Sequence, residues 1–157
     1  MTISLNDEDL QRGLDLFNHS QFFDSHEVLE DVWRALPRDR PPARRLRLHL
    51  QGVIQLAVAF HHESTGNHVG ARSVLERALR NLKDADRSFP ELDLDRLRAE
   101  MANWQKHFAG SAPRPKPPQI VSRKPAHSVK PPSKNRTRND RTTNVRTGNV
   151  RTGNDSN

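Results

Sequence analysis

The chain has 157 residues, enough for one domain, and carries 26 Lys or Arg, 19 Asp or Glu, eight His and no Cys. The absence of cysteine excludes a disulfide framework, a thiolate zinc site and a cysteine nucleophile. Residues 1–20 are acidic and contain no apolar h-region of a signal peptide. The best apolar run, residues 53–60, is far shorter than the roughly 20 residues that cross a membrane. We therefore expect a soluble, cytoplasmic protein without membrane association.

The charge is distributed unevenly along the chain. Residues 111–157 hold eleven basic and two acidic residues together with seven of the eleven prolines, whereas residues 1–110 hold 15 basic and 17 acidic residues. Residues 111–157 include almost no apolar residues, so burial cannot offset the entropy that ordering this segment would cost. We predict a folded domain over residues 1–110 and a disordered, Pro-rich, basic low-complexity tail over residues 111–157.

Hydrophobic periodicity predicts three helices in the first part of the chain. Over residues 7–17, Leu10, Leu14 and Phe17 recur at helical spacing. A second helix over residues 21–36 ends before Pro37, because the residue before a proline avoids the α region. A third helix over residues 43–63 is apolar nearly all round between residues 48 and 60, which is typical of a buried central helix.

Two more helices complete the prediction. Gly66 suits the left-handed position after a helix, and Asn67 suits the cap of a helix over residues 68–85. The last helix covers residues 94–108, with Asp93 as its cap. No stretch alternates with period two, so the fold class is all-α: a small bundle of about five helices around the buried central helix.

The second predicted helix carries ionisable residues on its apolar stripe. His26 and Glu30 are four residues apart, so their side chains meet on one face. They can satisfy each other's hydrogen bonds when partly buried, or both can bind a divalent metal ion. The motif H-E-x-x-H of zinc peptidases differs at its last position, which is Glu30 here. Trp33 lies on the same stripe and is interpreted as a core anchor.

The central helix offers partners for this pair. Gln51 and Gln55 line up on one face, and His61 lies on the adjoining face. If the two helices pack together, a polar cluster forms between them from His26, Glu30, Trp33, Gln51, Gln55 and His61. In the metal alternative, His26, Glu30 and His61 hold the ion, and Glu27 is the candidate catalytic base that activates water.

Two motifs resemble a known family. They are Phe17-Asn18 with Phe22-Phe23-Asp24-Ser25-His26-Glu27-Val28-Leu29-Glu30-Asp31-Val32-Trp33-Arg34, and Gln51-Gly52-Val53-Ile54-Gln55-Leu56-Ala57-Val58-Ala59-Phe60-His61-His62 followed by Gly66-Asn67 and Gly70-Ala71. Together they resemble the bacterial and archaeal domain of unknown function family 309 over about residues 17–82. The resemblance implies a compact all-helical domain whose signature includes His26, Glu27, Glu30, Trp33, Gln51 and His61. It implies no established activity, and it does not cover the tail.

The sequence does not establish a molecular function. The hypothesis we favour is a non-enzymatic module, structural or binding a ligand or partner, built on the polar cluster. The first alternative is a divalent-metal-dependent enzyme resembling hydrolases. The second is weak, salt-sensitive binding of polyanions such as nucleic acid by the eleven cations of the tail, which has no aromatic residue for base stacking.

Overall fold

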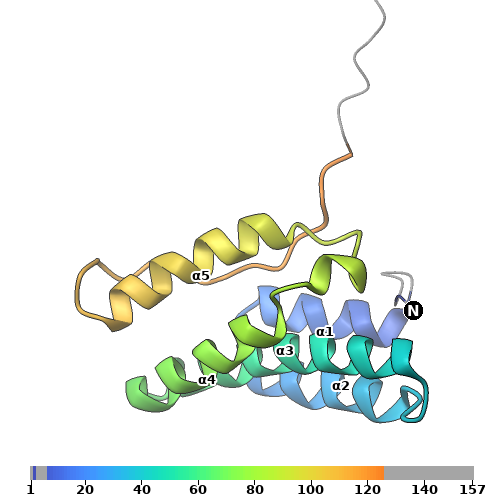
Figure 1. Ribbon diagram of the computed structural model, residues 1–157. Coiled ribbons are helices and arrows are strands. Elements are labelled where there is room, and N and C mark those ends of the chain that lie inside the picture. Colours follow the sequence, from blue (N-terminus) through green and yellow to red (C-terminus); the bar gives the residue numbers. More distant parts are fainter. Residues whose placement is uncertain (1, 3–6, 126–157) are drawn as a thin grey trace, which may run out of the picture. The chain divides into compact units, whose positions relative to one another are not determined.

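The computed structural model describes residues 2 and 7–125, and these residues form five α-helices and one 3₁₀ turn (Figure 1). The described part contains no β-strand, only an isolated antiparallel bridge between Leu92 and Ser122. This confirms the all-α prediction. None of the helices in this part combines the length and apolar character needed to span a membrane. The elements are α1 (Glu8–Asn18), α2 (Phe22–Ala35), α3 (Pro41–Ser64), α4 (His68–Asn81), η1 (Ala85–Arg87) and α5 (Leu94–Phe108).

Local sequence signals determine where several helices begin. Asn67 and Asp93 cap α4 and α5 as predicted, since their side-chain oxygens accept from the backbone N–H groups three residues later. Gly66 has a φ of 82°, the left-handed conformation expected after α3. Helix α3 begins at Pro41 and not at residue 43 as predicted, because proline needs no N–H partner in the first helical turn.

Aromatic rings from four helices meet in the core. The ring of Phe60 on α3 lies 6.2 Å from Phe17 on α1, 5.7 Å from Phe22 on α2 and 5.0 Å from Trp104 on α5. All four residues are at most 7% exposed. Edge-to-face ring contacts add to the stabilisation that apolar burial provides. This aromatic cluster connects α5 to the three helices that precede it along the chain.

Helix α3 is the central helix, as predicted, because it packs against both α2 and α4. The close approach of α4 requires a glycine at position 52. A Cβ atom added to Gly52 would lie 2.8 Å from Cγ of Leu82, directly after α4. A glycine thus allows the two helices to come close together at the middle of α3.

The packed part of the chain extends beyond residue 110, which corrects the predicted domain boundary. Residues 111–125, here called the strap, run back along the domain from the end of α5 (Figure 1). Ile120 is 3% exposed, and its backbone N–H and C=O bond the side chain of Asn18 at 2.7 and 2.8 Å. The predicted disorder is therefore wrong for residues 111–125. For residues 126–157 the prediction lies outside the described residues.

An ion pair holds the beginning of the strap on α3. The guanidinium of Arg114 donates to both carboxylate oxygens of Glu63, at 2.9 and 3.0 Å, and the Glu63 side chain is only 6% exposed. These hydrogen bonds raise the pKa of Arg114. A bidentate arginine compensates a carboxylate that is largely removed from water. Glu63 and Arg114 are 51 residues apart, so local patterning does not reveal the pair.

Docking of the strap predicts a measurable contribution to stability. We expect Ile120→Ala to lower the free energy of unfolding by about 2–4 kcal/mol, because it leaves a cavity at a buried site. The matched change Lys124→Ala, at an exposed position of the strap, should change it by less than about 0.5 kcal/mol. Urea unfolding of the full chain measures both values, and equal effects would contradict the docked strap.

Candidate functional site

The side chains of His26 and Glu30 meet on α2 as predicted. His26 Nε2 lies 2.9 Å from Glu30 Oε1, and His26 Nδ1 lies 3.3 Å from Glu27 Oε1. The other oxygen of Glu30 accepts from Arg34. The side chains of His26 and Glu30 are 22% and 31% exposed, so the imidazole lies half-buried between two carboxylates. A hydrogen bond to Glu30 occupies Nε2 of the ring, and the Glu27 carboxylate lies beside Nδ1.

Helix α3 supplies the opposite wall of a small pocket. The pocket has a volume of about 200 Å³ and is lined by His26, Glu30, Trp33, Gln51, Ile54, Gln55 and Val58; we call it the α2–α3 pocket. Five of the six residues of the predicted polar cluster therefore line one pocket. Ile54 and Val58 add apolar surface that the sequence analysis had assigned to the core. Gln55 is in turn held by α4, since its Oε1 accepts from Asn81 Nδ2 at 2.9 Å.

Trp33 is positioned by an arginine that the sequence analysis did not single out. Its indole Nε1 donates to the backbone oxygen of Arg47 at 3.0 Å, and the Arg47 guanidinium lies 3.7 Å from the centre of the ring system. Arg47 also donates to the backbone oxygens of Trp33 and Leu36, at the end of α2. This cation–π contact and the reciprocal hydrogen bonds fasten the end of α2 to the beginning of α3. Trp33 is consequently a rigid anchor and also part of the pocket wall.

His61 lies outside the lining of the pocket. Its ring is 5.5 Å from the ring of Phe23, which is itself 6.1 Å from the ring of His26. Phe23 is 54% exposed. These three side chains form an aromatic row beside the pocket, built from the start of α2 and the end of α3. Sequence reasoning placed His61 near His26 but did not include Phe23, whose exposure distinguishes it from a core residue.

The predicted set of three metal ligands does not come together. Among the residues that the structure describes, no group of three His, Asp or Glu side chains is arranged to hold a metal ion. His26 bonds to carboxylates on its own helix, while His61 faces Phe23. Glu27, the candidate base, has a side chain 60% exposed and is directed at His26. The geometry therefore does not favour the metal-dependent hydrolase.

A buried histidine that the sequence analysis did not predict lies at the other end of α3. His49 is 4% exposed, and its Nδ1 is 2.6 Å from Oγ of Ser88, which is 2% exposed. Burial, assisted by the nearby charge of Arg45, lowers the pKa of His49, while Asp84 and Asp86 act in the opposite direction. His49 lies near the start of a largely apolar helix segment, and nothing in the local sequence distinguishes this buried histidine from an exposed one.

The comparisons support the resemblance of the two motifs to a family of unknown function. Residues 10–74 match the model of the family described as Domain of unknown function (DUF309), and this stretch contains all the residues of the α2–α3 pocket. An uncharacterised protein of Bacillus subtilis, YpuF, is 36% identical over 74 residues, which cover 47% of this chain and 40% of YpuF. An uncharacterised protein of Aquifex aeolicus is 27% identical over 97 residues, covering 62% of this chain and 28% of that protein. The chain thus matches less than half of each relative, and neither has an assigned activity.

The buried histidine predicts a pH dependence of stability. Because the folded pKa of His49 lies below the usual value of about 6.5, the unfolded chain binds the proton more readily near that pH. The stabilisation is therefore present above about pH 6.5 and is lost as the pH falls, by at most about 1.4 kcal/mol per pH unit. Urea unfolding between pH 8 and pH 5 measures this loss, because the range spans the ordinary histidine pKa of about 6.5.

Two variants isolate this histidine from the others. In His49→Gln the fall in stability below about pH 6.5 should shrink, whereas His68→Gln, at an exposed position of α4, should retain it. Asp86 does not interfere, because a hydrogen bond from Arg98 lowers its pKa and moves its titration further into the acid range. A His49→Gln variant with an undiminished pH dependence would contradict the assignment.

Proposed function

We propose that this domain is a non-enzymatic binding module and that the α2–α3 pocket and the aromatic row receive a segment of a partner protein. The observation that supports this most is the pocket itself. Five polar or aromatic residues of the two motifs meet there beside apolar surface, and the lining comes from two helices that are firmly packed together. Such a mixture of apolar contact and directed hydrogen-bonding groups is typical of recognition sites.

The size of the pocket favours a protein side chain over a whole cofactor. Small-molecule sites usually have volumes of about 300–1,000 Å³. The α2–α3 pocket, at about 200 Å³, is smaller and is open to solvent on one side. One inserted side chain from a partner segment fits this volume. The rest of that segment would lie over the aromatic row beside the pocket.

The pocket and the aromatic row together are long enough for such a segment. Trp33 at the end of α2 contacts Arg47 near the start of α3, and Phe23 at the start of α2 contacts His61 near the end of α3, so the helices are antiparallel. From residue 23 to residue 33, α2 extends for roughly 15 Å at the rise of an α-helix. This length accommodates about two to three turns of a partner helix laid along it.

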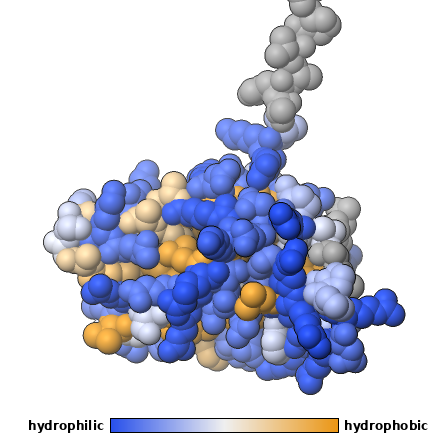
Figure 2. Space-filling model, viewed as in Figure 1, coloured by the Kyte–Doolittle hydropathy of each residue, from blue (hydrophilic) through white to orange (hydrophobic). Residues whose placement is uncertain are grey.

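Charge and exposure indicate what the partner carries. Asp24, Glu27, Glu30 and Asp31 make the outer side of α2 acidic, with Arg34 as the compensating cation. Phe23 is one of three large apolar side chains that are exposed among the described residues, the others being Leu48 and Val69. On the face seen in Figure 2 the surface is mostly hydrophilic, with small separate hydrophobic patches. We infer that the partner is a basic amphipathic segment with an apolar side chain for the pocket or the row.

A cytoplasmic location, expected from composition, and a bacterial origin, implied by the resemblance, belong to this proposal. A cytoplasmic location is consistent with a chain that lacks cysteine, and the similarity to proteins of Bacillus and Aquifex supports a bacterial origin. The binding of polyanions by the basic tail stays a separate prediction. Its eleven cations lie partly on the strap and partly outside the described residues.

Selection from a displayed library of random peptides against the full chain tests the proposal. We expect enriched peptides to combine Lys or Arg with an apolar or aromatic residue at helical spacing. Gln51→Trp, which places a bulky ring at the mouth of the pocket, should weaken their binding at least about tenfold, equivalent to roughly 1.4 kcal/mol. Isothermal titration of the enriched peptides measures the loss.

The control is the same substitution at an exposed glutamine of another helix. Gln105→Trp on α5 lies outside the α2–α3 pocket and should leave the affinity unchanged. If the enriched peptides bind Gln51→Trp as tightly as the unmodified chain, or show no basic and apolar pattern, the proposed function is wrong.

A further inference from the structure

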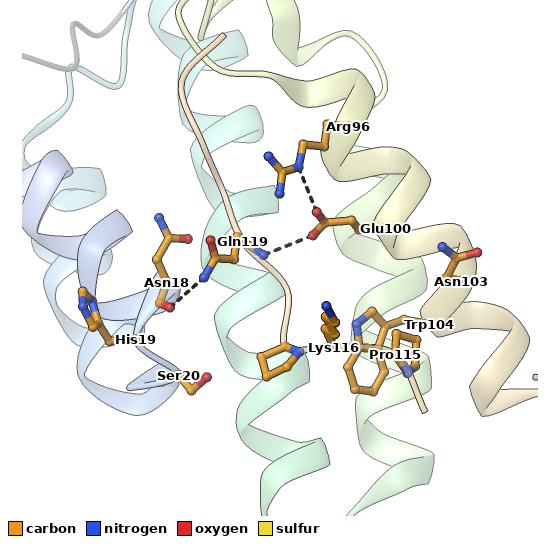
Figure 3. A pocket seen from close by; sticks show the side chains of 11 residues that line it. Asn18, His19, Ser20, Arg96, Glu100, Asn103, Trp104, Pro115, Lys116 and Gln119 are labelled. Atoms are coloured by element: carbon orange, nitrogen blue, oxygen red, sulfur yellow. Dashed lines mark hydrogen bonds and ion pairs between the residues drawn. The ribbon is translucent and has the colours of Figure 1, made fainter. Parts of the chain in front are cut away.

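A second and larger pocket lies where the strap crosses α5. It has a volume of about 680 Å³, and its lining comes from the turn after α1, from α5 and from residues 115–119 of the strap (Figure 3). This volume is within the range of about 300–1,000 Å³ that is usual for small-molecule sites. We call it the strap pocket. It shares no lining residue with the α2–α3 pocket.

Trp104 contributes an unpartnered donor to this pocket. The residue is 1% exposed, and its indole Nε1 is the buried side-chain nitrogen or oxygen that lacks a hydrogen-bond partner among the described residues. Leaving a buried N–H without an acceptor is costly, and most such groups in folded proteins are paired. In Figure 3 the nitrogen of the indole is on the edge that faces Lys116. An acceptor that reached this edge from the pocket would complete the site.

The carboxylate of Glu100 and both oxygens of Asn18, which line the pocket, already accept hydrogen bonds within the protein. Both carboxylate oxygens of Glu100 are engaged, one by Nε of Arg96 at 3.0 Å and the other by the backbone N–H of Gln119 at 3.2 Å. The Asn18 backbone oxygen accepts from the Gln119 side chain, and its side-chain oxygen accepts from Ile120. These bonds hold the strap against α1 and α5. They also leave the charge of Glu100 compensated.

Two charged donors of the lining have free N–H groups. Within the described residues, the ammonium of Lys116 makes no hydrogen bond or ion pair, and neither do the terminal nitrogens of Arg96. Lys116 offers an ammonium and Trp104 a neutral N–H, while Arg96 lies two helical turns away from Trp104 on α5. Donors of this kind bind carboxylate and phosphate groups through charge-assisted hydrogen bonds. Pro115 and Pro117 provide apolar surface for the remainder of a ligand.

We propose that the strap pocket binds a small organic anion, whose carboxylate or phosphate group accepts from Lys116 and the Trp104 indole. The apolar part of the anion packs against the prolines of the strap. The site depends on the strap, because residues 115–119 form one wall and carry the lysine. Three of its lining residues, Asn18, His19 and Ser20, lie within residues 10–74, but none of them lines the α2–α3 pocket, so the site is independent of the function proposed for that pocket.

Nuclear magnetic resonance of the ¹⁵N-labelled full chain tests this assignment. The chain has two tryptophans and hence two indole N–H signals, which Trp33→Phe assigns. The probes are inorganic phosphate and benzoate, each titrated to about 10 mM, a range that detects millimolar dissociation constants. Benzamide serves as the neutral counterpart of benzoate, and potassium chloride matches the ionic strength. We expect the Trp104 signal to shift when an anion is added. The Trp33 signal should stay in place, because the backbone oxygen of Arg47 already accepts a hydrogen bond from that indole.

Matched lysine variants identify the cation. Lys116→Gln should weaken anion binding about tenfold or more, while Lys124→Gln, on the same strap but outside the pocket, should not. A response to phosphate alone or to benzoate alone supports the proposal and identifies the anionic group. The proposal is overturned if neither anion moves the Trp104 signal, if benzamide acts like benzoate, or if both lysine variants behave alike.

Discussion

The packing of Phe60 against rings from three other helices is the interaction on which the remaining structure depends. Its contacts with Phe17, Phe22 and Trp104 join α1, α2 and α5 to the central helix α3. Because interiors are densely packed, this aromatic cluster determines how closely α2 approaches α3 and where α5 crosses. The α2–α3 pocket, the aromatic row and the strap pocket all lie on helices that it positions. Removing the ring would therefore alter both proposed binding sites together.

Several polar residues of the two motifs have hydrogen-bond or ion-pair partners within the domain, which explains how they can be partly buried. His26 lies between Glu27 and Glu30, Gln55 bonds Asn81, and Trp33 bonds Arg47. Half-buried polar groups need such partners, since an unpaired one would destabilise the fold. The same bonds fix the side chains around a small pocket in one orientation. A pre-organised wall of this kind loses little conformational entropy when a partner binds, which suits recognition.

The strap forms one wall of the strap pocket, which is separate from the α2–α3 pocket. It is held by the Glu63–Arg114 ion pair at one end and by backbone bonds to Glu91 and Asp93 at the other. Its prolines prevent a helix and leave an extended segment that covers α5. The Trp104 indole is covered by this segment yet lacks an acceptor, whereas the Trp33 indole on α2 has one. Both tryptophans are structural anchors, but only the N–H of Trp104 is left for a ligand to accept.

The sequence by itself determined the helices and most of the first site. Apolar periodicity and the caps Asn67 and Asp93 are local signals, and the spacing of His26 and Glu30 requires their contact on any α-helix. The tertiary structure decided what depends on distant partners. It separated His61 from the pocket, buried His49 against Ser88, and ordered residues 111–125 through Ile120 and Arg114. Composition could not indicate that ordering, because a buried isoleucine, the ion pairs of Arg114 and Arg123 and a few backbone bonds supply it. Their partners lie 19 to 102 residues away, in contacts that only the folded chain creates.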